Sequence, residues 1–292
     1  MIRYVLAGIT AMAAVLVYAR FQRGSSEEHE PTSWEWEGDV TPGNWLRIRN
    51  TNGEITVGES STDRARIRAT KTWKHGNADN VHFRVLSSGS DVTVCALWSR
   101  RDRCDENHYR VRLNGKFGRE NDTRVDFVVE LPRGVKIDAH TINGDVGITG
   151  ASAPVRANTV NGDVAAETKI GPVSAITVNG EISVSMDSIA GDGDIKLTTV
   201  NGSIEATMPA QLDADLEVAM LNGRFSTDYP ITQSVRERGG PKKVRATLGS
   251  GVRDIRITTV NGSVELRKAH HDAVPEAPAR PILPEPPGGG GN

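Results

Sequence analysis

The sequence has few aromatic residues, few cysteines and almost no net charge. Aromatic side chains make up 5% of the 292 residues, there are 2 cysteines, and the formal net charge is −2. A balanced charge gives no overall field that would attract nucleic acid, so we expect no nucleic-acid partner. The shortage of aromatic rings favours a thin core of Val, Ile, Ala and Thr over a thick one.

The sequence also lacks the compact motifs of common enzymes. It has no Gly-x-Ser-x-Gly elbow, no His-Glu-x-x-His pair and no phosphate-binding loop. Two cysteines alone are too few for a structural zinc site. We therefore predict that the protein is not an enzyme, with no catalytic residue, no metal site and no cofactor.

Six near-copies of one short phrase fill the second half of the chain. Thr159-Val160-Asn161-Gly162-Asp163-Val164 is one of them, and the six Asn-Gly pairs follow one another at intervals of 18, 18, 22, 21 and 39 residues. Apolar residues two apart flank each pair, which is the period of a strand with one buried face. The stretch 46–57 fits the same frame. The predicted repeat turns are Asn52 and Gly53, Asn143 and Gly144, Asn161 and Gly162, Asn179 and Gly180, Asn201 and Gly202, Asn222 and Gly223, and Asn261 and Gly262.

A repeat of about 20 residues built from strand formers predicts an all-β fold, a β-solenoid. The alternative is an antiparallel β-meander of stacked hairpins, because Asn-Gly also forms tight turns in which glycine takes a positive φ. Constant copy length favours coils, whose stacked Asn amides would hydrogen-bond along the stack. The 39-residue interval predicts a degenerate coil with Val244, Ala246 and Leu248.

Three acidic residues occupy one equivalent position in successive copies, namely Asp145, Asp163 and Glu181. Stacked about 4.8 Å apart, they would repel by about 0.9 kcal/mol per adjacent pair in water, which needs no cation. We interpret them as solvated turn residues. The alternative is a weak surface ladder for Ca²⁺ or a cationic polymer, although the Gly-Gly-x-Gly-x-Asp calcium repeat is missing.

The ends of the chain predict the compartment and the domain limits. Residues 4–19 carry no charge, so residues 1–23 form a signal peptide or an N-terminal membrane anchor, and both remain open. Residues 24–40 are expected to be a polar linker, 41–268 the repeat domain, and 269–292 a disordered Pro/Gly-rich tail. We expect an exported protein, periplasmic or extracellular, which residues 4–19 would tether to the inner membrane if they are not cleaved.

The two cysteines fit export. Cys95 and Cys104 lie close together in the sequence, and in an oxidising compartment such a pair indicates a disulfide. Closing a loop of this size contributes about 2.7 kcal/mol in the chain-entropy model.

Several phrases resemble a known family. They are the Asn-Gly copies, Val-Cys-Ala-Leu at 94–97, the strand with its Leu-Pro-Arg-Gly end at 125–135, and the closing copy at 255–262. Together they resemble the bacterial putative-adhesin family of β-strand-repeat envelope proteins, over about residues 40–268. The resemblance implies binding at the cell envelope or surface, with no defined ligand and no catalytic residues to transfer.

The sequence therefore predicts a non-enzymatic envelope protein that acts as a binding, adhesion or structural module, with a glycan or protein partner. A membrane contact is expected only through the N-terminal segment. One alternative is a carbohydrate-active enzyme on a β-helix, which would need a cleft with two carboxylates. Another is an envelope-stress accessory protein that acts through a membrane-protein partner.

Overall fold

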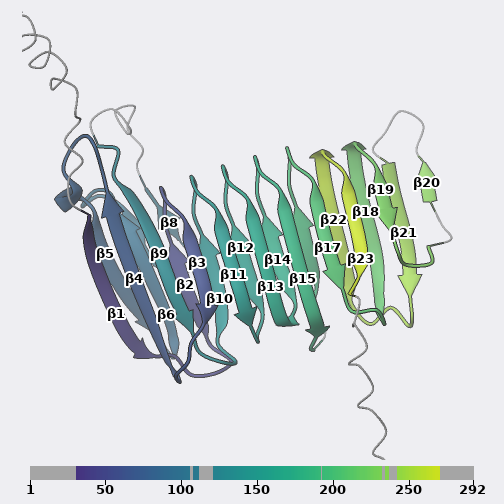
Figure 1. Ribbon diagram of the computed structural model, residues 1–292, viewed down its shortest axis with the longest axis horizontal. Helices are drawn as coiled ribbons and strands as arrows, with labels where there is room; N and C mark the ends of the chain where they lie inside the picture. Colours follow the sequence, from purple (N-terminus) through teal and green to yellow (C-terminus); the bar gives the residue numbers. More distant parts are fainter. Residues whose placement is uncertain are drawn as a thin grey trace, which may run out of the picture.

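The computed structural model describes residues 31–105, 108–111, 121–191, 193–231, 234–236 and 242–269. These residues form two large β-sheets that face each other and extend along one long axis (Figure 1). A two-stranded ribbon and one 3₁₀ turn, η1 (Ala78–Asn80), lie beside them.

Sheet A has ten strands. In spatial order they are β1 (Thr32–Asp39), β4 (Arg64–Thr72), β9 (Arg124–Leu131), β3 (Ile55–Glu59), β11 (Val146–Ala151), β13 (Val164–Gly171), β15 (Ile182–Ile189), β17 (Ile204–Met208), β23 (Val264–Lys268) and β19 (Phe225–Thr227).

Sheet B has eleven strands. In spatial order they are β20 (Ser234–Arg236), β21 (Lys242–Leu248), β18 (Ala214–Asn222), β22 (Asp254–Asn261), β16 (Ile195–Thr198), β14 (Val173–Ile176), β12 (Val155–Asn158), β10 (Lys136–His140), β2 (Trp45–Arg49), β6 (Asp91–Leu97) and β5 (His82–Ser88). The small ribbon is β7 (Arg103–Cys104) and β8 (Tyr109–Arg110).

The repeats form a β-solenoid, which confirms the predicted fold class. Each coil gives one strand to sheet B, turns at Asn-Gly, and gives the next strand to sheet A. Equivalent strands pair in parallel, so that Val155 lies between Ile137 and Val173. Parallel pairing of successive copies rules out the hairpin meander.

The core lies between the two sheets, and each sheet contributes one layer of side chains to it. Alternation places Ile182 inside at 1% exposure, whereas the preceding Glu181 is exposed. Stacked aliphatic residues form the two inner faces. On sheet A these are Ile55, Val146, Val164, Ile182, Ile204 and Val264, and on sheet B they are Leu46, Ile137, Val155, Val173, Ile195 and Ile255.

The described residues of the 39-residue interval form no extra coil, so the degenerate coil predicted there is wrong. Val244 and its neighbours lie in β21, which pairs antiparallel with β18 and places Val244 opposite Val218. The final copy, β22 and β23, lies between the β16/β17 coil and the β18/β19 coil. The alternating pattern of β21 identifies a strand but does not specify the direction of its partner, and this led to the error.

The N-terminal end has a related arrangement. The first coil, β2 and β3, lies between the β10/β11 coil and an outer layer of β6 and β9. Strands β5, β4 and β1 then close this end by antiparallel pairing. At both ends of the stack, therefore, the coil that is terminal in sequence is internal in space.

The polar linker expected at 24–40 is wrong for residues 32–39. This segment is β1, which pairs with β4 along its whole length. Its alternation of Ser, Trp, Glu, Trp and Glu directs Trp34 and Trp36 against the core, and Trp34 stacks on Phe83 with ring centroids 4.7 Å apart.

The predicted N-terminal segment and most of the predicted tail, residues 1–23 and 270–292, lie outside the described residues. Within the part of the chain that the structure describes, no helix has the length and apolar character needed to span a bilayer.

Candidate binding surface

The Asn side chains form a ladder along one edge of the stack. Asn161 donates from Nδ2 to Oδ1 of Asn143 at 2.8 Å, and Asn179 donates in the same way to Asn161. The same 2.8 Å bond recurs from Asn201 to Asn179, from Asn261 to Asn201 and from Asn222 to Asn261. The amide ladder expected from the sequence is confirmed.

Glycine follows each Asn because the coils approach closely there. A Cβ placed on Gly180 or Gly202 would overlap the carbonyl oxygen of the glycine one coil away. Only the early copies also need glycine conformationally, since φ is 124° at Gly53 and 142° at Gly144. The positive-φ hairpin explanation is therefore wrong for the later copies, and backbone contact is the reason for glycine.

The threonine that stands two residues before Asn in five of the copies has a role that the sequence did not indicate. Thr177 is 1% exposed and donates from Oγ1 to the carbonyl oxygen of Gly162 at 2.9 Å. Thr141, Thr159, Thr199 and Thr259 donate equivalently to the neighbouring glycine at 2.8–3.0 Å. Its recurrence in five copies was the available signal.

The acidic residues of the predicted ladder link neighbouring coils. Oδ1 of Asp145 accepts the backbone N–H of Asp163 at 2.8 Å, and Oδ1 of Asp163 accepts that of Glu181 at 2.8 Å. In a later coil, Oγ of Ser203 accepts the backbone N–H of Ser263 at 3.2 Å. Among the described residues, no group of three or more His, Cys, Asp or Glu is arranged to hold a metal ion. The alternative of a weak surface ladder for Ca²⁺ or a cationic polymer stays a prediction.

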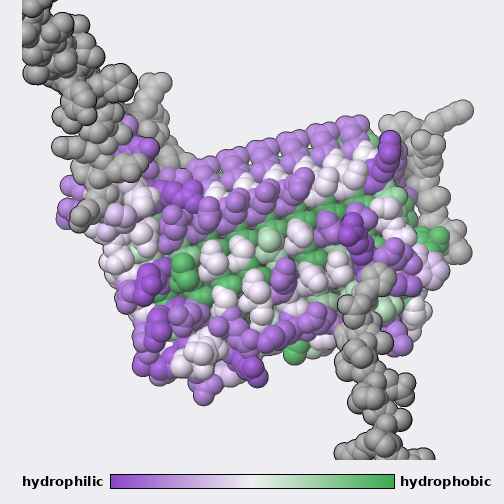
Figure 2. Space-filling model, viewed as in Figure 1, coloured by the Kyte–Doolittle hydropathy of each residue, from purple (hydrophilic) through white to green (hydrophobic). Residues whose placement is uncertain are grey.

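An aliphatic residue precedes Asn in six coils. The residue before it, Thr in five coils and Met220 in the sixth, points inward, so this residue points outward. Val178 is 37% exposed, Val200 36% and Leu221 50%. We call this set the aliphatic row, and in stacking order it comprises Ile142, Val160, Val178, Val200, Val260 and Leu221. Figure 2 shows how residues of similar hydropathy lie in bands along the long axis of the molecule.

The two sheets differ in charge. The strands of sheet A contain ten acidic and eight basic residues, whereas those of sheet B, leaving aside β20, contain five acidic and ten basic residues. A chain with a small net charge is thus divided into a basic sheet and a slightly acidic one.

The charges on sheet A are also better paired. Glu205 and Glu265 are register neighbours, and Arg267 bridges both at 3.1 and 2.9 Å. On sheet B, Lys196 and Arg256 are register neighbours, and neither has an ion pair among the described residues. Like charges directly opposite each other destabilise a sheet when nothing neutralises them.

Arg156 continues this line of cations toward the N-terminal end. It lies in the same register as Ser174 and Lys196, and its guanidinium lies 4.5 Å from the ring centroid of Trp45. We call Arg156, Lys196 and Arg256 the basic row. Sequence reasoning missed it, although all three stand five residues before an Asn.

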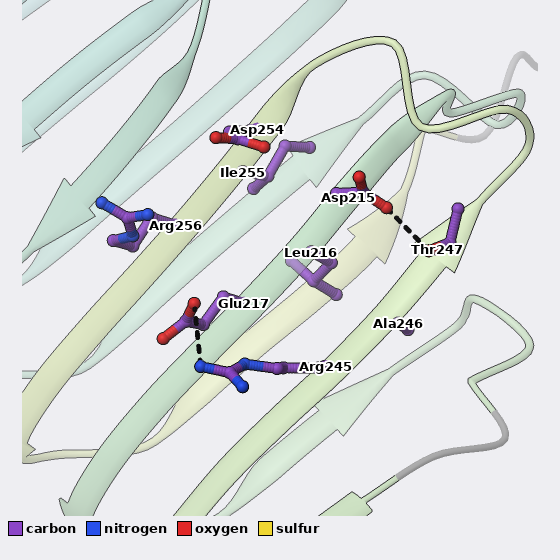
Figure 3. A pocket seen from close by; sticks show the side chains of 9 residues that line it. All are labelled: Asp215, Leu216, Glu217, Arg245, Ala246, Thr247, Asp254, Ile255 and Arg256. Atoms are coloured by element: carbon purple, nitrogen blue, oxygen red, sulfur yellow. Dashed lines mark hydrogen bonds and ion pairs between the residues drawn. The ribbon is translucent and has the colours of Figure 1, made fainter.

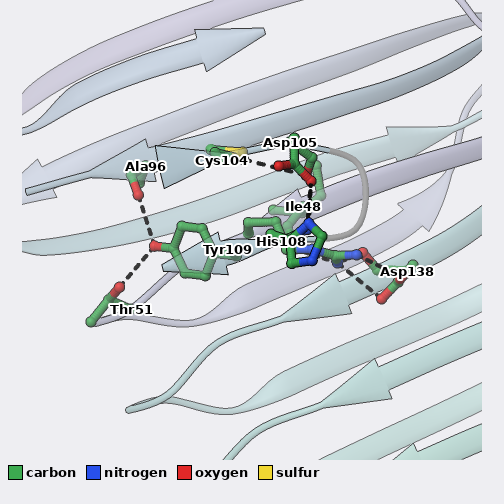
Figure 4. The surroundings of a disulfide bond; sticks show 10 residues. Ile48, Thr51, Ala96, Cys104, Asp105, His108, Tyr109 and Asp138 are labelled. Atoms are coloured by element: carbon green, nitrogen blue, oxygen red, sulfur yellow. Dashed lines mark hydrogen bonds and ion pairs between the residues drawn. A yellow bond between two sulfur atoms is a disulfide. The ribbon is translucent and has the colours of Figure 1, made fainter. Parts of the chain in front are cut away.

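The predicted disulfide between Cys95 and Cys104 is present, with the Cα atoms 6.6 Å apart. Tyr109 of β8 donates its hydroxyl to the carbonyl oxygen of Ala96 at 2.8 Å and contacts the hydroxyl of Thr51 at 2.7 Å (Figure 4). The disulfide segment therefore covers the outer face of sheet B at its N-terminal end.

A buried ion pair lies on the same side of sheet B. Arg49 and Asp138 are 2.7 Å apart with side chains only 12% and 11% exposed. Burial lowers the pKa of the adjacent His140, and the neighbouring charge of Arg49 adds to this effect. These groups are closed off by protein, so the accessible part of the outer face begins beyond them.

A cavity of about 380 Å³ lies at the C-terminal end of sheet B (Figure 3). Its charged groups come from three strands in two rows. Asp215 accepts a hydrogen bond from the hydroxyl of Thr247 at 2.7 Å, and Glu217 lies 3.6 Å from Arg245. Asp254 and Arg256 of β22 complete the two rows.

The geometry defines the class: a two-sheet β-solenoid whose edge and outer faces present side chains in regular rows. The chain belongs to the Toastrack DUF4097 family, whose model matches residues 121–267. This confirms the family resemblance drawn from the repeats.

Several solved structures are similar to this chain at low identity. A putative cell adhesion protein from Clostridium sporogenes shares 11% identity, over 82% of this chain and 100% of that one, with a TM-score of 0.41. A putative adhesin from Bacteroides fragilis shares 11%, over 82% and 97%, with a TM-score of 0.28. A putative lipid binding protein from Parabacteroides distasonis shares 10%, over 82% and 97%, with a TM-score of 0.27. The chain matches no curated protein sequence.

Proposed function

We propose that the protein is a non-enzymatic, exported binding module of the cell envelope. The supporting observation is the aliphatic row, six outward aliphatic side chains at one position of six stacked coils. The core does not require them, because each inner face already has its own aliphatic ladder. Exposed apolar side chains that are contiguous and rimmed by polar groups are typical of interaction sites.

The shape of this surface favours an extended partner. Equivalent groups recur about every 4.8 Å along the stack, so a long ligand meets the same contact several times. Several weak contacts along one ligand add up to useful affinity when their spacing matches.

The disulfide supports export. Both cysteines are buried, at 0% and 5% exposure, and are linked to each other. Such bonds persist in oxidising compartments and are rare in the cytosol. Cell fractionation with thiol labelling tests this. We expect the full chain in the envelope fraction, with Cys95 and Cys104 unlabelled because they are bonded to each other. Labelled free thiols in a cytosolic pool would overturn the proposal.

A binding screen with the full chain tests the module. Immobilised protein is exposed to an envelope extract and to a glycan array, and each captured partner is measured again with a Val178→Ser/Val200→Ser variant. We expect the variant to lose binding by about tenfold or more, as for contacts at the centre of an interface. The matched control, Ser183→Ala/Ser185→Ala on sheet A, keeps full binding. If every captured partner bound both variants as tightly as the unaltered protein, the aliphatic row would not be the binding surface.

The cavity at the C-terminal end of sheet B favours a second candidate, a carbohydrate-active enzyme. It brings Asp215, Glu217 and Asp254 to one hollow, and sugar-cleaving enzymes use two carboxyl groups. Two of the three carboxylates are, however, engaged by Thr247 and Arg245. Release of reducing sugar from envelope glycans that is lost in Glu217→Gln and Asp254→Asn would favour the enzyme over the binding module.

A further inference from the structure

We infer that the C-terminal half of the basic sheet docks on an anionic lipid surface, with the aliphatic row at the contact. The inference rests on the proposed binding function and names its partner. It is separate from any membrane contact made by residues 4–19.

The first argument is the order of rows across the outer face of sheet B. Counting back from Asn, position −1 is the aliphatic row, and −3 is uncharged from β12 onward. Position −5 carries the basic row, with Ser174 of β14 and Glu217 of β18 at the same position, and −7 is acidic at the C-terminal end. Outward residues two apart in a strand are about 7 Å apart, so the basic row lies about 13 Å from the aliphatic row. The uncharged −3 residues are Asn158, Ile176, Thr198, Thr258 and Ala219, and the acidic −7 residues are Asp194, Asp254 and Asp215.

This order matches the polarity profile of a bilayer surface. Aliphatic side chains would enter the boundary between headgroups and acyl chains, as the apolar faces of interfacial segments do. Lys and Arg have long side chains that reach anionic headgroups while their stems cover apolar surface. The acidic row is then the farthest from the lipid, which is the placement that an anionic surface requires.

The second argument is a change of charge along the edge itself. The residue two after Asn is acidic in the first coils, Asp145, Asp163 and Glu181, and becomes Ser203, Ser263 and finally Arg224 in stacking order. The acids vanish where the unpaired Lys196 and Arg256 appear. The C-terminal half of the edge is therefore the half that suits an anionic partner.

The third argument concerns the cost of removing this edge from water. The Asn amides already hydrogen-bond to one another along the stack at 2.8 Å. A ladder whose groups are satisfied internally loses less on desolvation than isolated amides would. Leu221, half exposed at the end of the row, adds the largest apolar side chain of the set at this end.

A depth measurement on the full chain tests the inference. A polarity-sensitive fluorophore is attached at Leu221→Cys, and the matched control carries it at Ser226→Cys, which lies in the same coil on the outer face of sheet A. Vesicles of phosphatidylcholine with or without phosphatidylglycerol are added. We expect a blue shift and quenching by lipid-borne quenchers at position 221 only, and only with the anionic lipid.

Charge variants provide the second readout. Each cation near an anionic surface changes partitioning by about fivefold, so Lys196→Gln/Arg256→Gln should weaken the docking roughly 30-fold. Arg66→Gln/Arg68→Gln removes the same charge from sheet A and should leave the signal at position 221 unchanged. Thermal unfolding of each variant verifies that it is folded.

The outcomes separate the inference from the proposed function. An aqueous label at position 221 in anionic vesicles, or an equal shift at position 226, overturns lipid docking. If dextran sulfate protects position 221 with the same dependence on Lys196 and Arg256 while vesicles do not, the partner is a soluble polyanion and the lipid assignment is wrong. If an envelope protein or glycan is captured through the aliphatic row but vesicles fail, the binding module stands without lipid.

Discussion

The middle of the stack and its N-terminal end are held together in different ways. In the middle, from β10 to β17, every coil repeats the same Thr-to-glycine bond, Asn amide bond and aliphatic pair. At the N-terminal end the contacts occur once each: a disulfide, the stack of Trp34 on Phe83, and the ion pair of Arg49 with Asp138. Repeated contacts make each middle coil depend on both neighbours, whereas single contacts stabilise the end locally.

The largest loss of stability in the middle of the stack is expected from a charge placed in its core. Ile182→Asp would bury a carboxylate without a partner between two coils, because Ile182 is 1% exposed. We expect a loss of several kcal/mol in the free energy of unfolding, measured by denaturant titration. The neighbouring Glu181→Gln is the control and should change stability little. Equal damage from both would contradict the alternation of β15.

The N-terminal end should respond to loss of its disulfide. Cys95→Ser removes the link to Cys104, and the chain-entropy model gives a loss of about 2.7 kcal/mol. Hydrogen exchange should rise in β6 and in the segment that carries Tyr109, while β12 to β15 stay protected. Uniform deprotection of the whole stack would show that the end and the middle are one cooperative unit.

A smaller effect is expected from one rung of the threonine ladder. Thr177→Val keeps the shape but leaves the carbonyl oxygen of Gly162 without this hydrogen bond, at a cost of about 1–2 kcal/mol in unfolding free energy. The exposed Thr149→Val, on the outer face of β11, controls for the substitution itself. A larger loss at Thr149 would contradict the placement of the ladder.

The smallest expected effect tests an ion pair that joins the two regions. Glu59 of β3 contacts Lys169 of β13 and Arg133, and the hydrogen bond from Lys169 is the main cause that lowers the pKa of Glu59. Since the folded pKa is lowered, this pairing favours the folded state above the unfolded pKa and is lost as pH falls through the folded one. In Lys169→Gln, carboxyl NMR titration should show the pKa of Glu59 move up toward its usual range. An unchanged titration would show that Arg133 alone holds the carboxylate.

Much of the middle could be predicted from the sequence, because repetition and alternation are local signals. The parallel coils, the Asn ladder, the inward Ile182 and the disulfide of Cys95 with Cys104 are all confirmed. The order of coils at the ends could not be predicted, since a strand pattern such as that of β21 or β1 does not name its neighbour. The reason for glycine at 180 and 202 was also hidden, because it lies in contact between coils and not in the local backbone.

The surface was the least predictable part. The stacked acids were identified, but their hydrogen bonds to the next coil depend on the spacing between coils. The basic row became visible only when Lys196 and Arg256, 60 residues apart in sequence, were placed side by side. The effect of a surface charge depends on the charges beside it in space, and which residues lie side by side depends on the non-sequential order of the coils.

That order has a consequence for synthesis. Among the described strands, the β18/β19 coil pairs with the rest of the stack only through β22 and β23, which are synthesised after it. A chain that ends before residue 254 could complete every coil up to β17, but it would have no strand to receive the outer one. The 15 residues from β22 to β23 are therefore needed to complete the stack, because they occupy the position between the β16/β17 coil and the β18/β19 coil.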